Sequence, residues 1–197
     1  MKKKLRIGVL ASTRGTNLQA LIDDLRQDDS LYEIVCVVSD VNESGAISKA
    51  REAKIPGVFL DPVGKKRTEY DEKMASVLMK YEVDLVCLIG YMRIITKPFI
   101  DAFRNRIINV HPALIPAYSG PGFYGDKVHE SVLADGCKIS GMTIHYVDEN
   151  VDGGEIICQK ACEIEEDDNV ADVKAKVQAL EKEWYPKVVR MLARGGQ

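Results

Sequence analysis

The sequence of 197 residues contains only three histidines, so few side chains can carry acid–base chemistry near neutral pH. One of them, His111, stands two residues after Asn109 at the end of an apolar run, and alternate residues of a strand point to the same side. Pro112 disfavours helical geometry at His111. A carboxamide beside an imidazole supplies two donors that could stabilise a developing oxyanion. The pair therefore predicts either an active site or a structural histidine near a turn.

Asp152 is a candidate partner for this histidine. It lies in a turn that also contains two glycines, and the geometry of such a turn does not require an aspartate. A carboxylate near His111 would favour the imidazolium form and orient the ring. His145 falls on the strand that leads into the turn, and we interpret it as a supporting group. We expect the third histidine, His129, on the surface of a helix.

Two further segments carry polar groups at the end of an expected strand. Residues 12–17, Ser-Thr-Arg-Gly-Thr-Asn, precede a helix, whose free N–H groups and dipole suit a phosphate. The segment lacks the glycine spacing of the nucleotide-binding motifs, so a plain helix cap is the alternative. Arg93 follows a buried strand and suits a planar, partly charged ligand, although a surface arginine with a packed stem fits equally. In open α/β sheets, ligands bind at the carboxyl ends of the strands, where these segments should meet.

Apolar runs alternate with stretches of helical periodicity, which predicts an α/β fold with a parallel sheet. We expect strands at residues 5–11, 32–39, 58–60, 85–89 and 106–110, and helices after the first loop and at 46–54 and 67–81. After residue 136 the pattern changes, and strands at 139–147 and 155–164 are expected to pair antiparallel. A long amphipathic helix follows, which Pro186 should kink or interrupt. We expect a single domain over residues 1–197.

The composition excludes several classes of protein. Hydrophobic residues make up 46% and charged residues 29%, which is ordinary for a globular domain, and the net charge of −3 argues against a nucleic-acid binder. No run of 18 apolar residues is present, so no membrane span is expected. The five cysteines form no CxxC pair, which favours a reducing, cytoplasmic compartment and argues against a metal site.

Two segments resemble one known family. Residues 109–116, Asn-Val-His-Pro-Ala-Leu-Ile-Pro, resemble the Asn-Ile-His-Pro-Ser-Leu-Leu-Pro segment of the folate-dependent formyltransferases. Residues 141–154, Gly-Met-Thr-Ile-His-Tyr-Val-Asp-Glu-Asn-Val-Asp-Gly-Gly, resemble the second signature of that family, which ends in its catalytic aspartate. The likeness covers nearly the whole chain. It implies a Rossmann-like α/β fold, with a mostly parallel central sheet, helices on both faces and an antiparallel C-terminal portion.

The resemblance also implies an activity. The branch of the family that this chain resembles most transfers a formyl group from 10-formyltetrahydrofolate to the amine of glycinamide ribonucleotide in purine synthesis, by direct attack through a tetrahedral intermediate. The family's catalytic residues fall on Asn109, His111 and Asp152. Its ribonucleotide-binding residues fall on Gly15, Thr16, Asn17 and Glu181. Its folate-binding residues fall on Arg67, Met92, Arg93, Ile94, Ile95, Asn109, Asp148, Glu149, Asn150, Val151 and Asp152.

The same resemblance implies partners and absences. 10-Formyltetrahydrofolate is expected as a co-substrate, without a metal ion. Both partners are then small molecules, with no nucleic acid and no membrane, and the chain is expected as a monomer or homodimer.

Two departures from the family limit what is carried over. Thr13 stands where the family commonly has glycine, which tolerates positive φ angles that threonine does not. Residues 118–125, Tyr-Ser-Gly-Pro-Gly-Phe-Tyr-Gly, differ from the usual family pattern. We therefore carry over neither the path of the first loop nor the contacts of residues 118–125.

Two alternatives stay open. A formyltetrahydrofolate deformylase would hydrolyse the formyl group, although it carries an extra N-terminal regulatory domain. Methionyl-tRNA and sugar-nucleotide formyltransferases normally carry C-terminal extensions that we do not expect here. A non-catalytic dinucleotide-binding protein would use Asp40, which follows the second strand, as a ribose-binding acid, but Gly15 stands alone where three spaced glycines are expected.

Overall fold

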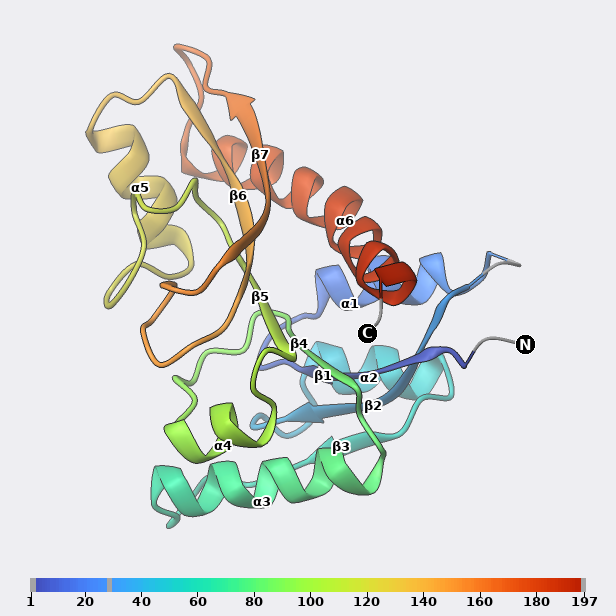
Figure 1. The fold of residues 1–197 in the computed structure, drawn as a ribbon. Coiled ribbons are helices and arrows are strands. Elements are labelled where there is room, and N and C mark those ends of the chain that lie inside the picture. The colour runs from blue at the N-terminus through green and yellow to red at the C-terminus, as the bar shows by residue number, and fades with distance from the viewer. Residues whose placement is uncertain (1–2, 28–29, 196–197) are drawn as a thin grey trace.

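A computed structural model describes residues 3–27 and 30–195 (Figure 1). At its centre is a seven-stranded sheet in the order β3-β2-β1-β4-β5-β6-β7. The strands are β1 (Leu5–Leu10), β2 (Tyr32–Ser39), β3 (Gly57–Phe59), β4 (Leu85–Leu88), β5 (Ile107–His111), β6 (Ile139–Tyr146) and β7 (Ile156–Glu163). The helices are α1 (Thr16–Asp24), α2 (Gly45–Glu52), α3 (Arg67–Lys80), α4 (Lys97–Ala102), α5 (Asp126–Ala134) and α6 (Val170–Gly195).

Strand β6 runs in the opposite direction to the other six strands of the sheet. Strands β1 to β5 pair parallel to one another, whereas β6 pairs antiparallel with both β5 and β7. The expected parallel sheet with an antiparallel C-terminal portion is therefore confirmed. The strands and the two helices for which we expected bounds lie within two residues of those bounds, and α4 was not expected.

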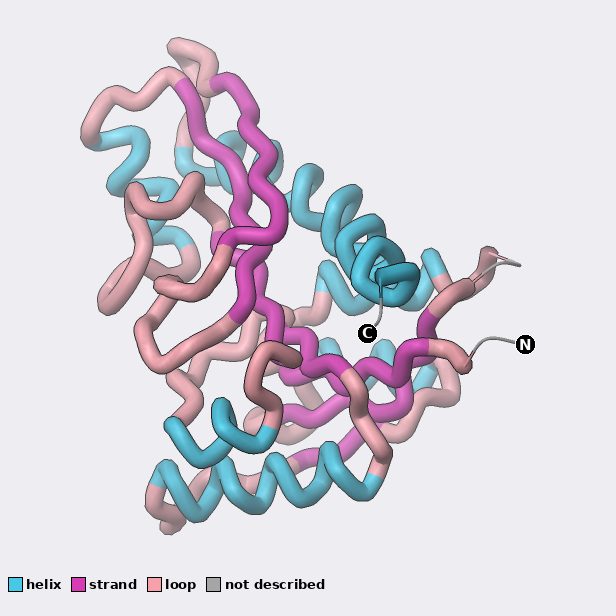
Figure 2. Tube along the Cα trace, viewed as in Figure 1, coloured by secondary structure: helices cyan, strands magenta, loops and turns pink. Residues whose placement is uncertain are grey.

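Helices cover both faces of the sheet (Figure 2). In β1, Ile7 and Val9 belong to an apolar cluster that includes side chains of α1, α2 and α6. Their neighbour Leu10 belongs to a second cluster, formed with α3 and α4. Successive side chains of a strand point to opposite faces, so a strand that is covered on both sides needs an unbroken apolar run. This explains why the sequence of the inner strands lacks alternation.

Helix α6 runs without interruption past Pro186, so of the expected kink or interruption, the interruption is wrong. A proline removes one backbone donor from a helix, but here the flanking residues are held by packing. Tyr185 and Val189 are fully buried, and the Tyr185 hydroxyl donates to the Leu88 carbonyl at 3.2 Å. Tertiary contacts on both sides of Pro186 therefore keep the helix continuous.

The described residues bear on two expectations, one about the cysteines and one about a membrane span. All five cysteines are free thiols, and Cys36 and Cys87 are buried. Among residues 3–27 and 30–195, no helix is long and apolar enough to cross a membrane.

Candidate functional site

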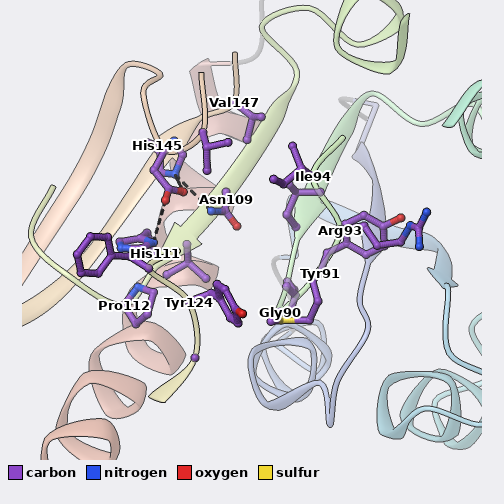
Figure 3. Close-up of a pocket in the computed structure, with 18 of the residues that line it drawn as sticks. Gly90, Tyr91, Arg93, Ile94, Asn109, His111, Pro112, Tyr124, His145 and Val147 are labelled. Atoms are coloured by element: carbon purple, nitrogen blue, oxygen red, sulfur yellow. Dashed lines mark hydrogen bonds and ion pairs between the residues drawn. The ribbon is translucent and has the colours of Figure 1, made fainter. Parts of the chain in front are cut away.

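Segments that follow three parallel strands line a single cavity of about 690 Å³ (Figure 3). They are Thr13, Arg14, Thr16 and Asn17 after β1, residues 88–95 at the end of β4, and residues 109–112 at the end of β5. Residues 120–125 and 147–152 complete the wall. The expected convergence of polar segments at the carboxyl ends of the strands is therefore observed.

His111 and Asp152 lie next to each other in the wall of this cavity. Nδ1 of His111 lies 3.4 Å from Oδ2 of Asp152, and the His111 side chain is only 4% exposed. Nε2 of His111 lies 2.7 Å from the carbonyl oxygen of Tyr118. A carbonyl only accepts, so Nε2 carries a hydrogen and donates it, and Nδ1 is the nitrogen that faces the carboxylate.

Burial decides the charge of this histidine. It lowers the pKa of His111, while the charge of Asp152 and the hydrogen bond to Tyr118 act in the opposite direction without overcoming it. Asp152 therefore favours the imidazolium, as expected, but burial outweighs this effect. The pKa of His111 thus lies below its ordinary value, which favours the neutral imidazole.

Asp152 is held as a carboxylate. Burial acts to raise its pKa, but the neighbouring His145, the charge of His111 and the backbone N–H of Gly120 together lower it. That N–H donates to Oδ2 at 3.0 Å. Asp152 also has φ of +56°, a left-handed conformation that costs a non-glycine residue about 1 kcal/mol. The turn thus contains an aspartate although the backbone conformation at this position favours glycine.

Asn109 and His145 face each other across the antiparallel pair of β5 and β6. Nδ1 of His145 donates to the Tyr146 carbonyl at 2.7 Å, so in the neutral ring Nε2 accepts a hydrogen bond. Nδ2 of Asn109 lies 3.3 Å from that Nε2, and Figure 3 shows the two side chains pointing toward one another. His145 Nε2 also lies 3.7 Å from Oδ1 of Asp152. His145 therefore connects Asn109 and Asp152, as a supporting group should.

The first loop and α6 meet at another part of the wall. Nδ2 of Asn17 donates to Oε2 of Glu181 at 2.8 Å, and Glu181 is 8% exposed. Burial raises the pKa of Glu181 to about 7. Thr16 also lines the cavity, whereas Gly15 shapes the loop: its φ is +68°, and a side-chain carbon there would lie 3.0 Å from Cα of Ala46.

All but one of the residues expected around a folate line the cavity. Met92, Arg93, Ile94, Ile95 and residues 148–152 line the cavity. Arg67 does not, because it lies exposed at the start of α3. The Arg93 guanidinium carbon lies 4.9 Å from the centroid of the Tyr70 ring, and the side chain points away from His111 (Figure 3). Its buried Nε has no hydrogen-bond partner among the described residues.

His129 corrects an expectation. It is 2% exposed and lines the cavity, whereas the sequence placed it on the surface. Burial lowers its pKa. His129 lies between Val128 and Val132 on the buried face of α5, and the i, i+3 spacing to Val132 was the signal that could have shown this. The cavity also includes Tyr124, Lys174 and Gln178, which the sequence did not single out.

The first loop and the segment after β4 are joined by hydrogen bonds. Ser12 Oγ donates to Oδ1 of Asp40 at 2.6 Å and accepts from the backbone N–H of Met92 at 3.0 Å. Asp40 is thus engaged within the protein, which disfavours its use as a ribose-binding acid. Thr13 has no positive φ, so the threonine is compatible with the path of this loop.

No group of three or more His, Cys, Asp or Glu side chains that could hold a metal ion occurs in the part of the chain that the structure describes. The cavity instead offers hydrogen-bond donors, the Asp152 carboxylate beside the imidazoles of His111 and His145, and apolar surface, which together suit polar organic ligands.

A model of a known protein family matches most of the chain. The family model described as "Formyl transferase" matches residues 5–189. The chain is 35% identical over 188 residues to the phosphoribosylglycinamide formyltransferase of Bacillus subtilis, which covers 95% of this chain and 94% of the relative. It is 37% identical over 195 residues to the human trifunctional purine biosynthetic protein adenosine-3, covering 98% of this chain but only 19% of that protein. The chain thus spans about a fifth of the length of this relative.

Similarity extends to solved structures. The crystal structure of glycinamide ribonucleotide transformylase 1 from Symbiobacterium toebii superimposes with a TM-score of 0.93 at 39% identity, over 99% of this chain and 90% of that one.

Proposed function

The chain belongs to the formyl transferase family, and we propose that it transfers a formyl group from 10-formyltetrahydrofolate to the amine of glycinamide ribonucleotide. The observation that carries the proposal is the cavity itself. It brings Asn109, His111 and Asp152 together between a wall that contains Asn17 and Glu181 and a second wall that contains residues 92–95. Relatives of nearly the same length, named for this activity, support the same reaction.

The reaction begins with a neutral amine. An α-amino group with a pKa near ~8 has an appreciable neutral fraction at neutral pH. Its nitrogen attacks the formyl carbon, and the carbonyl oxygen becomes an oxyanion. Nδ2 of Asn109 has two hydrogens; one is directed to His145, and the other donates to the oxyanion.

Proton transfer falls to His111. The lowered pKa of His111 favours the neutral ring, and Nδ1, the nitrogen without a hydrogen, faces the Asp152 carboxylate, so that carboxylate passes the surplus proton of the attacking amine to Nδ1. Asp152 then stabilises the imidazolium across the 3.4 Å contact. The same proton passes to the folate nitrogen as the carbon–nitrogen bond breaks. No covalent enzyme intermediate forms, so no serine or cysteine nucleophile is required.

We assign the two substrates to opposite parts of the wall. Thr16, Asn17 and Glu181, with Gly15 shaping the loop, bind the ribonucleotide near the N-terminus of α1, where the helix dipole favours a phosphate. Met92, Arg93, Ile94, Ile95 and residues 148–152 bind the folate. Arg67 lies outside the cavity, so we assign it to a charged end of the folate that extends beyond the wall.

The proposal is tested by following release of the folate product by absorbance, with and without glycinamide ribonucleotide. Transfer predicts that release depends on the amine substrate and yields one formylated ribonucleotide per folate. Release that ignores the amine would indicate a hydrolase of the deformylase type. Calorimetry that finds tight NAD binding and no response to either substrate would indicate a dinucleotide-binding protein.

A further inference from the structure

We infer that residues 118–120 position the His111–Asp152 pair and that the Tyr118 side chain anchors this segment outside the cavity. The effect on turnover rests on the proposed function, whereas the effect on the His111 ring does not. The family resemblance assigned no contact to residues 118–125, since their sequence departs from the usual pattern.

The segment bonds both members of the pair. The Tyr118 carbonyl accepts from Nε2 of His111 at 2.7 Å, and the Gly120 backbone N–H donates to Oδ2 of Asp152 at 3.0 Å. Oδ2 is also the oxygen that faces Nδ1 of His111 at 3.4 Å. Three consecutive residues therefore set both the rotation of the imidazole and the position of the carboxylate.

The Tyr118 side chain ties this segment to the end of α5. Its hydroxyl donates to Oδ2 of Asp135 at 2.6 Å and lies 3.1 Å from Sγ of Cys137. Its ring packs edge-on against Phe123, with centroids 6.0 Å apart and planes at 77°. Asp135 and Cys137 belong to the connection between α5 and β6 and do not line the cavity.

The backbone of Tyr118 shows why an anchor matters. Its φ is +51°, in the left-handed region where an aromatic residue is held only by its surroundings. Release of the hydroxyl would allow Tyr118 to relax toward a negative φ, which rotates the carbonyl that His111 uses. Tyr118 is thus a positioning residue that acts through His111.

The geometry has a spectroscopic consequence. Because a carbonyl only accepts, His111 must keep its hydrogen on Nε2, and its titrating proton sits on Nδ1. His145 donates from Nδ1 to the Tyr146 carbonyl and therefore has the opposite tautomer. Two histidines in the same cavity, which both contact Asp152, are expected to carry their hydrogens on different ring nitrogens.

The test uses the full chain labelled with 15N-histidine. Ring-nitrogen spectra, assigned with His129→Gln and His145→Gln, should show His111 as the Nε2–H tautomer and His145 as the Nδ1–H tautomer. Tyr118→Phe, which removes only the hydroxyl, should turn His111 into a mixture of tautomers. It should also lower kcat about threefold to tenfold, the factor that one hydrogen bond is worth, with KM changed less than about twofold.

Three variants separate positioning from general destabilisation. Tyr81→Phe removes a hydroxyl at the end of α3, far from the cavity lining, and should leave both the spectrum and kcat unchanged. Asp135→Asn keeps an acceptor oxygen and should retain most activity, whereas Asp135→Ala should behave like Tyr118→Phe.

The inference is overturned if His111 carries its hydrogen on Nδ1 in the parent protein. It is also overturned if Tyr118→Phe leaves the tautomer unchanged, whether or not kcat falls. A tautomer change in a protein that transfers no formyl group would support the positioning and reject the proposed function instead.

Discussion

A side-chain carbon at Gly90 would lie 2.5 Å from Oγ1 of Thr13, closer than such carbons approach any atom. Because Gly90 has no side chain, the side chain of Thr13 can occupy this space. The backbone N–H of Ser12 also donates to the Gly90 carbonyl at 3.1 Å. The first loop and the segment after β4, which lie side by side in the cavity wall, are thus fitted to each other.

We expect Gly90→Ala to destabilise the protein by about 2 kcal/mol, because it adds this collision to a φ of +58°. Urea unfolding measures the change. The double variant Thr13→Gly with Gly90→Ala should recover the stability that is lost to the collision. It should not recover the stability that is lost to the positive φ at residue 90. Equal instability of the single and double variants would show that the two side chains do not compete for this space.

Glu181→Gln should flatten the pH dependence of stability. The pKa of Glu181 is about 7 in the folded chain and 4.5 ordinarily, so its contribution is complete below about pH 4.5 and is lost as the pH rises through 7. The loss is on the order of 3 kcal/mol. Unfolding free energies of the parent and the variant across this range measure it. The exposed neighbour Glu183, changed to glutamine, is the control and should leave the slope as in the parent.

His111→Ala should lower kcat by about 10²- to 10⁴-fold, the usual contribution of a positioned acid–base group. Binding of glycinamide ribonucleotide should stay within a few-fold, because we assign it to Asn17 and Glu181. Steady-state kinetics and calorimetry measure the two quantities separately. Turnover near that of the parent enzyme would remove His111 from the reaction.

Asp152→Asn should lower the pKa of His111 further, because the Asp152 charge is what raises it against burial. Asparagine tolerates the φ of +56°, so the fold should persist, whereas Asp152→Ala should add a backbone penalty of about 1 kcal/mol. Titration of the His111 ring by NMR measures the shift. An unchanged or higher pKa in the asparagine variant would contradict the proposed pairing.

Sequence alone predicted the strands well because an unbroken apolar run indicates a strand that is buried on both faces of the sheet. It also placed Asn109 and His111 correctly, since strand-end residues of a parallel sheet share one edge. The net charge state of His111 depends on how deeply the assembled fold buries it, which no local pattern reports. The burial of His129 and the continuity of α6 at Pro186 likewise arise from packing between elements distant in sequence.

Helix α6 has a consequence for how the protein is made. It packs against α1, α5, β6 and β7, and its residues Val173, Val177 and Tyr185 complete one apolar cluster of the sheet. It also supplies Glu181 to the cavity. During translation every strand leaves the ribosome before this helix does. The nascent chain therefore exposes the apolar surface that α6 later covers, and the candidate site lacks Glu181 until α6 has emerged.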